Sequence, residues 1–79
     1  MPVKIFLAVN VKSGRMKQVQ GDIKKFEEVT LACSVSAGPY NVVALVEVPT
    51  LEEYKSFSID KVSTLQDITD YTSFIIIDQ

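Results

Sequence analysis

The stretch Val35-Ser36-Ala37-Gly38-Pro39-Tyr40-Asn41-Val42-Val43-Ala44-Leu45-Val46-Glu47-Val48 decides the fold. Apolar runs stand at both ends, and residues 38–41 separate them. Val-rich runs favour extended backbone, whereas Gly, Pro and Asn are typical of a reversing chain. The stretch therefore predicts a β-hairpin with its tip at residues 38–41. Because the tip combines a glycine, an aromatic hydroxyl and a side-chain amide, we expect it to help hold any small molecule that the protein binds.

The chain before the hairpin predicts a strand, a helix and a second strand. Apolar residues alternate over residues 3–11, which is typical of a strand. An apolar stripe at helical spacing follows, with Ser13 as the expected N-cap; its members are Met16, Val19, Ile23 and Phe26. A second alternation over residues 29–37 predicts the strand that enters the hairpin.

The chain after the hairpin predicts a strand, a helix and a last strand. Residues 42–48 are apolar at both parities, which indicates a strand covered on both faces. Thr50 and Glu53 form a capping box after Pro49, so a helix begins there. The helix carries an apolar stripe of Leu51, Tyr54 and Phe57. The last strand is expected from about Asp67 to Ile77.

The order strand, helix, strand, strand, helix, strand predicts an α+β, ferredoxin-like fold in one domain over residues 1–79. Right-handed connections place both helices on one face of a four-stranded antiparallel sheet. The odd-numbered apolar residues of the first two strands should face the helices. The opposite face should gather apolar side chains that nothing covers, namely Phe6, Ala8, Ala32, Val43, Leu45 and either Phe74 or Ile76. Since an exposed apolar patch marks an interface, we expect a homodimer formed through this face, as a dimeric α+β barrel.

Size and composition lead to the same expectation. A chain of 79 residues is short enough to need a disulfide, a metal or a partner subunit. The single cysteine, Cys33, excludes an internal disulfide, and the lack of histidine argues against a zinc site, so no metal or cofactor is expected. Cys33 itself is expected to be a buried structural thiol.

Charge and hydropathy exclude other classes of protein. The net charge of −2 and the pI of about 4.9 argue against a nucleic-acid surface. No apolar run approaches the roughly 20 residues of a membrane helix, and no signal peptide is recognisable. We therefore expect a cytoplasmic protein, where a free thiol is ordinary.

Two segments carry a resemblance to a known family. Residues 38–46, which read Gly-Pro-Tyr-Asn-Val-Val-Ala-Leu-Val, and Leu51-Glu52-Glu53-Tyr54 resemble the effector domain of the Lrp/AsnC family. This domain is also called the RAM (regulation of amino acid metabolism) domain, and the resemblance covers about residues 3–78. Asn41 stands where the family commonly has Asp. Family regulators carry a helix-turn-helix before this domain, whereas this chain begins at the first strand, so it resembles the stand-alone RAM proteins and no direct contact with nucleic acid is expected.

The resemblance implies an oligomeric, amino-acid-binding protein. Such domains dimerise through their sheets, assemble further into tetramers or octamers and bind amino acids where dimers meet, and a stand-alone domain can pair with a full-length regulator. The site residues that it implies are Gly38, Pro39, Tyr40 and Asn41 at the tip, with Thr69, Asp70 and Thr72 in the last strand. Gly38 allows close backbone approach, and Asn41 offers both a donor and an acceptor. Asp70 is the expected partner of the ligand ammonium, and Thr69 or Thr72 of its carboxylate.

Two other classes of function stay open on the sequence. Dimeric ferredoxin-like barrels include small monooxygenases and isomerases, which need an acid–base group or a cofactor. The chain has no histidine, and its carboxylates are mostly expected to be exposed, although Asp70 is flanked by strand residues, so we expect no enzyme. The other alternative is a purely structural oligomerisation module.

Overall fold

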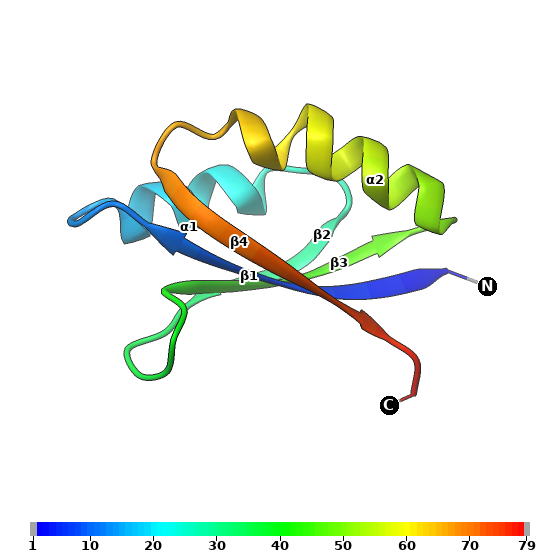
Figure 1. Cartoon of the computed structure of the whole chain (residues 1–79), viewed down its shortest axis with the longest axis horizontal. Coiled ribbons are helices and arrows are strands. Elements are labelled where there is room, and N and C mark those ends of the chain that lie inside the picture. The colour runs from blue at the N-terminus through cyan, green and yellow to red at the C-terminus, as the bar shows by residue number, and fades with distance from the viewer. Residues whose placement is uncertain (1, 79) are drawn as a thin grey trace.

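The predicted order of elements is present in the structure, a computed structural model that describes residues 2–78 (Figure 1). The elements are β1 (Val3–Val11), α1 (Met16–Lys24), β2 (Val29–Ser34), β3 (Val42–Val48), α2 (Leu51–Asp60), the 3-10 turn η1 (Val62–Thr64) and β4 (Ile68–Ile76). The strands form one antiparallel sheet in the order β2-β3-β1-β4. Both helices cover the same face of this sheet, so the ferredoxin-like α+β prediction is confirmed.

The core lies between the sheet and the helices. The alternation of β1 places Ile5, Leu7 and Val9 in the core with no exposed surface. Even-numbered residues of β3 and the stripes of both helices join them; these are Val42, Ala44, Val46, Val48, Val19, Ile23, Tyr54 and Phe57. Within residues 2–78, no helix is long and apolar enough to cross a membrane.

The two helices begin differently. Thr50 has extended backbone, and its Oγ1 accepts a hydrogen bond from the Glu53 N–H at 3.2 Å, so the predicted cap of α2 is confirmed. The predicted cap of α1 is wrong. Arg15 occupies the N-cap position, and no side chain within residues 2–78 caps the helix. Gly14, with φ +81°, separates Ser13 from the helix start, so the Ser13 hydroxyl lies too early in the chain to cap it.

The β2 residues that face the core also differ from those predicted. Val29 pairs with Val46, but Leu31 pairs with Leu45, so the register shifts between them. A bulge of this kind adds one residue to a strand and reverses its alternation. Ala32 therefore joins the core at 4% exposed, whereas Leu31 is 57% exposed. The expected place of Ala32 on the uncovered face is wrong, and Cys33 is half-buried on that face instead of buried in the core.

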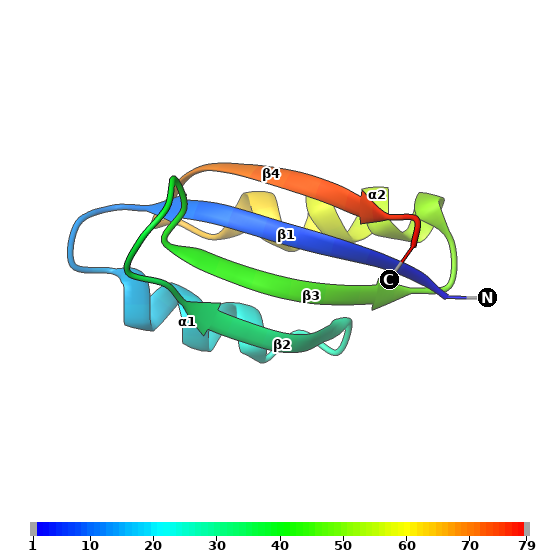
Figure 2. The same ribbon diagram turned by 90° about the horizontal axis from the view of Figure 1, so that it is seen from below.

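We call the sheet surface opposite the helices the open face (Figure 2). A row of four apolar side chains crosses all four strands on this face, because each residue pairs with the next in register; we call Leu31, Leu45, Phe6 and Phe74 the apolar row. Phe6 and Phe74 are 40% and 48% exposed, and their ring centroids lie 6.3 Å apart. The predicted exposed apolar surface is therefore present, with Leu31 in place of Ala32. The expectation that Ala8 is uncovered is wrong, because Ala8 is buried at 1% exposed.

Candidate functional site

The loop between β2 and β3 leaves the sheet on the open face. Residues 35–41 hang below the sheet in Figure 1, and in Figure 2 the loop passes in front of β1 toward β4. The Val35 N–H donates to the Asn41 carbonyl oxygen at 2.9 Å and closes the base of the loop. Gly38 has φ +103°, a conformation that residues with a Cβ rarely adopt. The turn thus requires glycine at this position.

Tyr40 ties this loop to β4. Its hydroxyl donates to Thr72 Oγ1 at 3.1 Å. Thr72 pairs across β1–β4 with Ala8, so the bond spans β1 at the level of this small residue. Ala8 is 1% exposed although it belongs to the open face. The hairpin tip therefore covers one end of the open face and leaves the apolar row uncovered beside it.

Asn41 joins the base of the loop to β1. Its backbone N–H donates to the Val9 carbonyl oxygen at 3.0 Å. Its side-chain Oδ1 accepts the Val11 N–H at 3.0 Å. Both contacts are to one short segment of β1, so the position of the loop is set by this strand.

The β4 side of the site is polar. Asp70 Oδ1 accepts a hydrogen bond from Asn10 Nδ2 at 3.0 Å. Asp70 and Thr72 pair with Asn10 and Ala8, which places both on the open face. Thr69 is exposed and lies at the register shift between the Asn10–Asp70 and Val11–Ile68 pairs. Asn10, which contacts the predicted site residue Asp70, is a candidate that our sequence reasoning missed, although a polar residue near the end of an apolar strand is a signal for it.

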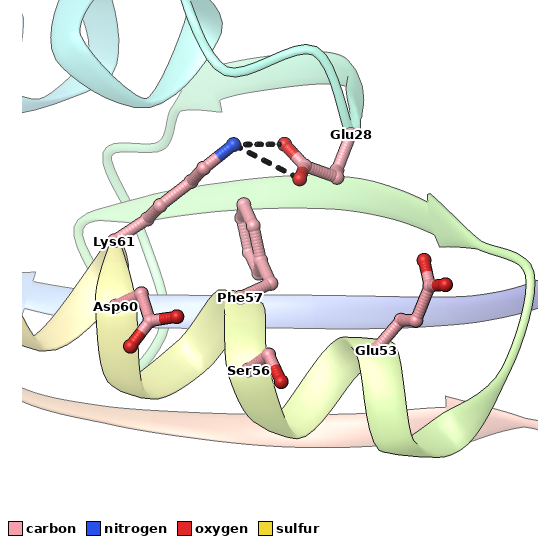
Figure 3. A pocket seen from close by; sticks show the side chains of 6 residues that line it. All are labelled: Glu28, Glu53, Ser56, Phe57, Asp60 and Lys61. Carbon is pink, nitrogen blue, oxygen red and sulfur yellow. Dashed lines mark hydrogen bonds and ion pairs between the residues drawn. The ribbon is translucent and has the colours of Figure 1, made fainter.

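A hollow lies on the helix side, away from the predicted site residues. It measures about 320 Å³ and is lined by Glu28, Glu53, Ser56, Phe57, Asp60 and Lys61 (Figure 3). Lys61 Nζ donates to both carboxylate oxygens of Glu28 at 2.9 Å. The same ammonium lies 5.7 Å from the ring centroid of Phe26 and 5.9 Å from that of Phe57.

Electrostatics make this pair a structural contact. Burial alone would raise the pKa of Glu28, but the hydrogen bond and charge of Lys61, with a backbone hydrogen bond, hold it below its ordinary value of 4.5. Glu28 therefore stays ionised and paired at neutral pH. Within the described chain, no three His, Cys, Asp or Glu residues lie close enough to hold a metal ion.

Comparison with known proteins identifies the family. Residues 4–79 match the model of the Lrp/AsnC ligand binding domain. The chain belongs to the Lrp/AsnC family. No curated protein matches this Lrp/AsnC domain in sequence.

Solved structures share the fold of this Lrp/AsnC domain. TTHA0845 from Thermus thermophilus has a TM-score of 0.90 and 21% identity, over 98% of this chain and 95% of that one. FFRP-DM1 has a TM-score of 0.89 and 25% identity, over 95% of this chain and 99% of that one. NMB0573 of Neisseria meningitidis, solved as a complex with L-Met, has a TM-score of 0.84 and 13% identity. The match to NMB0573 spans 98% of this chain but 51% of that one.

The expected site residues of this Lrp/AsnC domain fall into three groups. Tyr40 and Thr72 are in direct contact, and Asp70 lies on the same face as Thr72. Asn41 contacts β1. Gly38 and Pro39 are exposed at the tip, and Thr69 is exposed on β4.

Proposed function

We propose that this Lrp/AsnC domain forms an oligomer that binds a small effector, an amino acid, and thereby modulates transcription regulation or amino-acid metabolism. The observation that carries this proposal is the contact of Tyr40 with Thr72, which joins the hairpin tip to β4 across the open face. The family match supports it, as does the L-Met complex of the similarly folded NMB0573.

The polar groups around this contact suit an amino acid. Asp70 is exposed and supplies a carboxylate for the ligand ammonium, an interaction stronger than a neutral hydrogen bond. The hydroxyls of Thr72 and Thr69 supply donors for the ligand carboxylate, and the Tyr40 hydroxyl, which donates to Thr72 Oγ1, holds the Thr72 side chain in place. Gly38 lets the ligand approach the backbone closely, and Pro39 restricts the conformation of the tip.

The oligomer uses the apolar row. Its residues Leu31, Phe6 and Phe74 are each at least 40% exposed in the single chain, and a second copy packed sheet to sheet removes this surface from water. The hairpin tip lies beside the row, so dimers that assemble into a tetramer or octamer bring tips from different copies to the effector. A full-length Lrp/AsnC regulator in the cytoplasm is the expected further partner.

Thermal unfolding against a panel of the common amino acids at millimolar concentration tests the proposal. A ligand at about 100 times its dissociation constant adds about 2.7 kcal/mol to the free energy of unfolding, which shifts the melting temperature of a domain of this size by roughly 10–20 °C. We expect a rise selective for one or a few amino acids. Sedimentation velocity on the same samples reports whether that amino acid also changes the oligomer. A panel without any rise contradicts the amino-acid effector.

A further inference from the structure

We infer that Asn41 is the positioning residue of the effector site: its side chain fixes the base of the hairpin on β1, places Tyr40 over the open face and makes no contact with the ligand. The inference rests on the proposed function, because it concerns how the same site is arranged. It assigns to Asn41 a different role from that of its neighbour Tyr40.

Asn41 uses three of its atoms to hold the loop. Its backbone N–H donates to the Val9 carbonyl and its own carbonyl accepts from the Val35 N–H. These two bonds are independent of the side chain. The third bond, from the Val11 N–H to Asn41 Oδ1 at 3.0 Å, exists only because the side chain carries an acceptor.

The Asn41 side chain accepts a hydrogen bond from a backbone N–H, that of Val11, which lies beyond the last residue pair of β1 and β3. Val9 and Val42 are the last residues that β1 and β3 pair in register, and Val11 lies two residues further along β1. A part-buried backbone donor without an acceptor is unfavourable. Asn41 Oδ1 provides that acceptor, so the loop stays attached to β1 at the point where the ladder has ended.

This attachment determines where Tyr40 lies. Tyr40 precedes Asn41 directly, and its hydroxyl must reach Thr72 Oγ1 at 3.1 Å on the far side of β1. Asn10, between the two residues that Asn41 contacts, donates to Asp70 on the β4 side. One segment of β1, residues 9–11, therefore links the loop on one side to β4 on the other. A binding site is precise only when such supporting contacts fix its side chains.

A direct ligand contact by Asn41 makes a different prediction. Because Oδ1 already accepts from Val11, such a contact would use the NH₂ donor of the amide. Asn41→Asp keeps the acceptor and removes the donor, whereas Asn41→Leu has a similar volume and removes both. The two variants therefore separate positioning from contact.

The experiment measures amide hydrogen exchange of Val11 by NMR, together with the dissociation constant of the amino acid that stabilises the wild type most. For Asn41→Leu we expect faster exchange at Val11 and a dissociation constant raised about tenfold, the loss typical of one part-buried hydrogen bond. For Asn41→Asp we expect Val11 to stay protected and binding to stay within about twofold, with a repeat at high salt to screen the added charge. If Asn41→Leu does not fold, Asn41→Ala replaces it, since it removes the acceptor without adding volume.

Controls separate this inference from loss of stability and from failure of the proposed function. Thr50→Ala removes the cap of α2 on the other face of the sheet and should lower stability without changing ligand affinity. Weak binding by Asn41→Asp with Val11 still protected overturns the inference, as does wild-type binding by Asn41→Leu with Val11 unprotected.

If the wild type binds no amino acid, the proposed function fails, and the nuclear Overhauser contact between the Tyr40 ring and the Thr72 methyl group then decides the positioning role. Asn41→Leu should lose this contact and Asn41→Asp should keep it; the contact persisting in Asn41→Leu overturns the inference.

Discussion

At the scale of single residues, the ion pair of Lys61 and Glu28 joins α2 to the turn before β2. The side chains are 38% and 26% exposed, so solvent screens much of their attraction. The ammonium also lies over Phe26 and Phe57, whose rings meet edge to face with centroids 5.6 Å apart. The pair therefore completes an aromatic cluster, and its charge adds a modest contribution to stability.

Lys61→Met tests this contribution. We expect it to lower the free energy of unfolding by less than about 1 kcal/mol at pH 7, the usual range for a partly exposed pair. Because the pKa of Glu28 is lowered in the folded state, the stabilisation is complete above pH 4.5 and is lost as the pH falls through the folded-state pKa. Urea unfolding at neutral and acidic pH measures it, with Lys55→Met on the same helix as the charge-matched control. An equal loss at both pH values contradicts the assignment.

At the scale of elements, the N-terminal cap of α2 is a local feature that the sequence alone predicts. Thr50 accepts from the Glu53 N–H, and Glu52 and Glu53 place negative charge at the N-terminal end of the helix dipole. We expect Thr50→Ala to lower the free energy of unfolding by about 1 kcal/mol. Thr50→Ser keeps the hydroxyl and should recover most of the loss in a thermal scan. A Thr50→Ser variant as unstable as Thr50→Ala would show that the hydroxyl is not what stabilises this end of the helix.

The elements that the sequence predicted well are those whose signal is local. The alternation of β1, the α2 stripe and the turn residues 38–41 each depend on neighbouring residues. The β1 alternation and the turn are where they were expected, although the strand before the turn ends at Ser34 and not at residue 37. Of the α2 stripe, Tyr54 and Phe57 are buried, whereas Leu51 is exposed. The prediction of which β2 residues face the core was wrong, because the bulge after Val29 depends on pairing with β3. For the same reason, no local pattern could show that Asn41 contacts Val11 or that Asn10 contacts Asp70. The site residues could be named from the tip and the family resemblance, but their grouping required the sheet order.

At the scale of the whole molecule, the two faces of the sheet differ in what they contact. The helix-side face forms the core, whereas the open face carries the apolar row and the loop of the hairpin tip (Figure 2). We expect Phe6→Glu, which places a charge in the middle of the apolar row, to reduce the proposed oligomer to monomers in sedimentation velocity. Ile59→Glu, at a residue of α2 that is 67% exposed, is the matched control and should leave the mass unchanged. An unchanged mass for Phe6→Glu would place the subunit contact elsewhere.

In the function proposed above, Tyr40 and Thr72 form the effector site on the open face. The most direct measurement compares the melting temperature of Tyr40→Phe and Tyr71→Phe with and without the amino acid that stabilises the wild type. Both variants remove one tyrosine hydroxyl. Tyr71 lies in β4 next to Thr72, but its hydroxyl forms a hydrogen bond with the Ser58 hydroxyl at 2.6 Å on the helix side of the sheet. We predict that the ligand-induced rise disappears or is strongly reduced in Tyr40→Phe and is kept in Tyr71→Phe. A full rise in Tyr40→Phe would contradict the account.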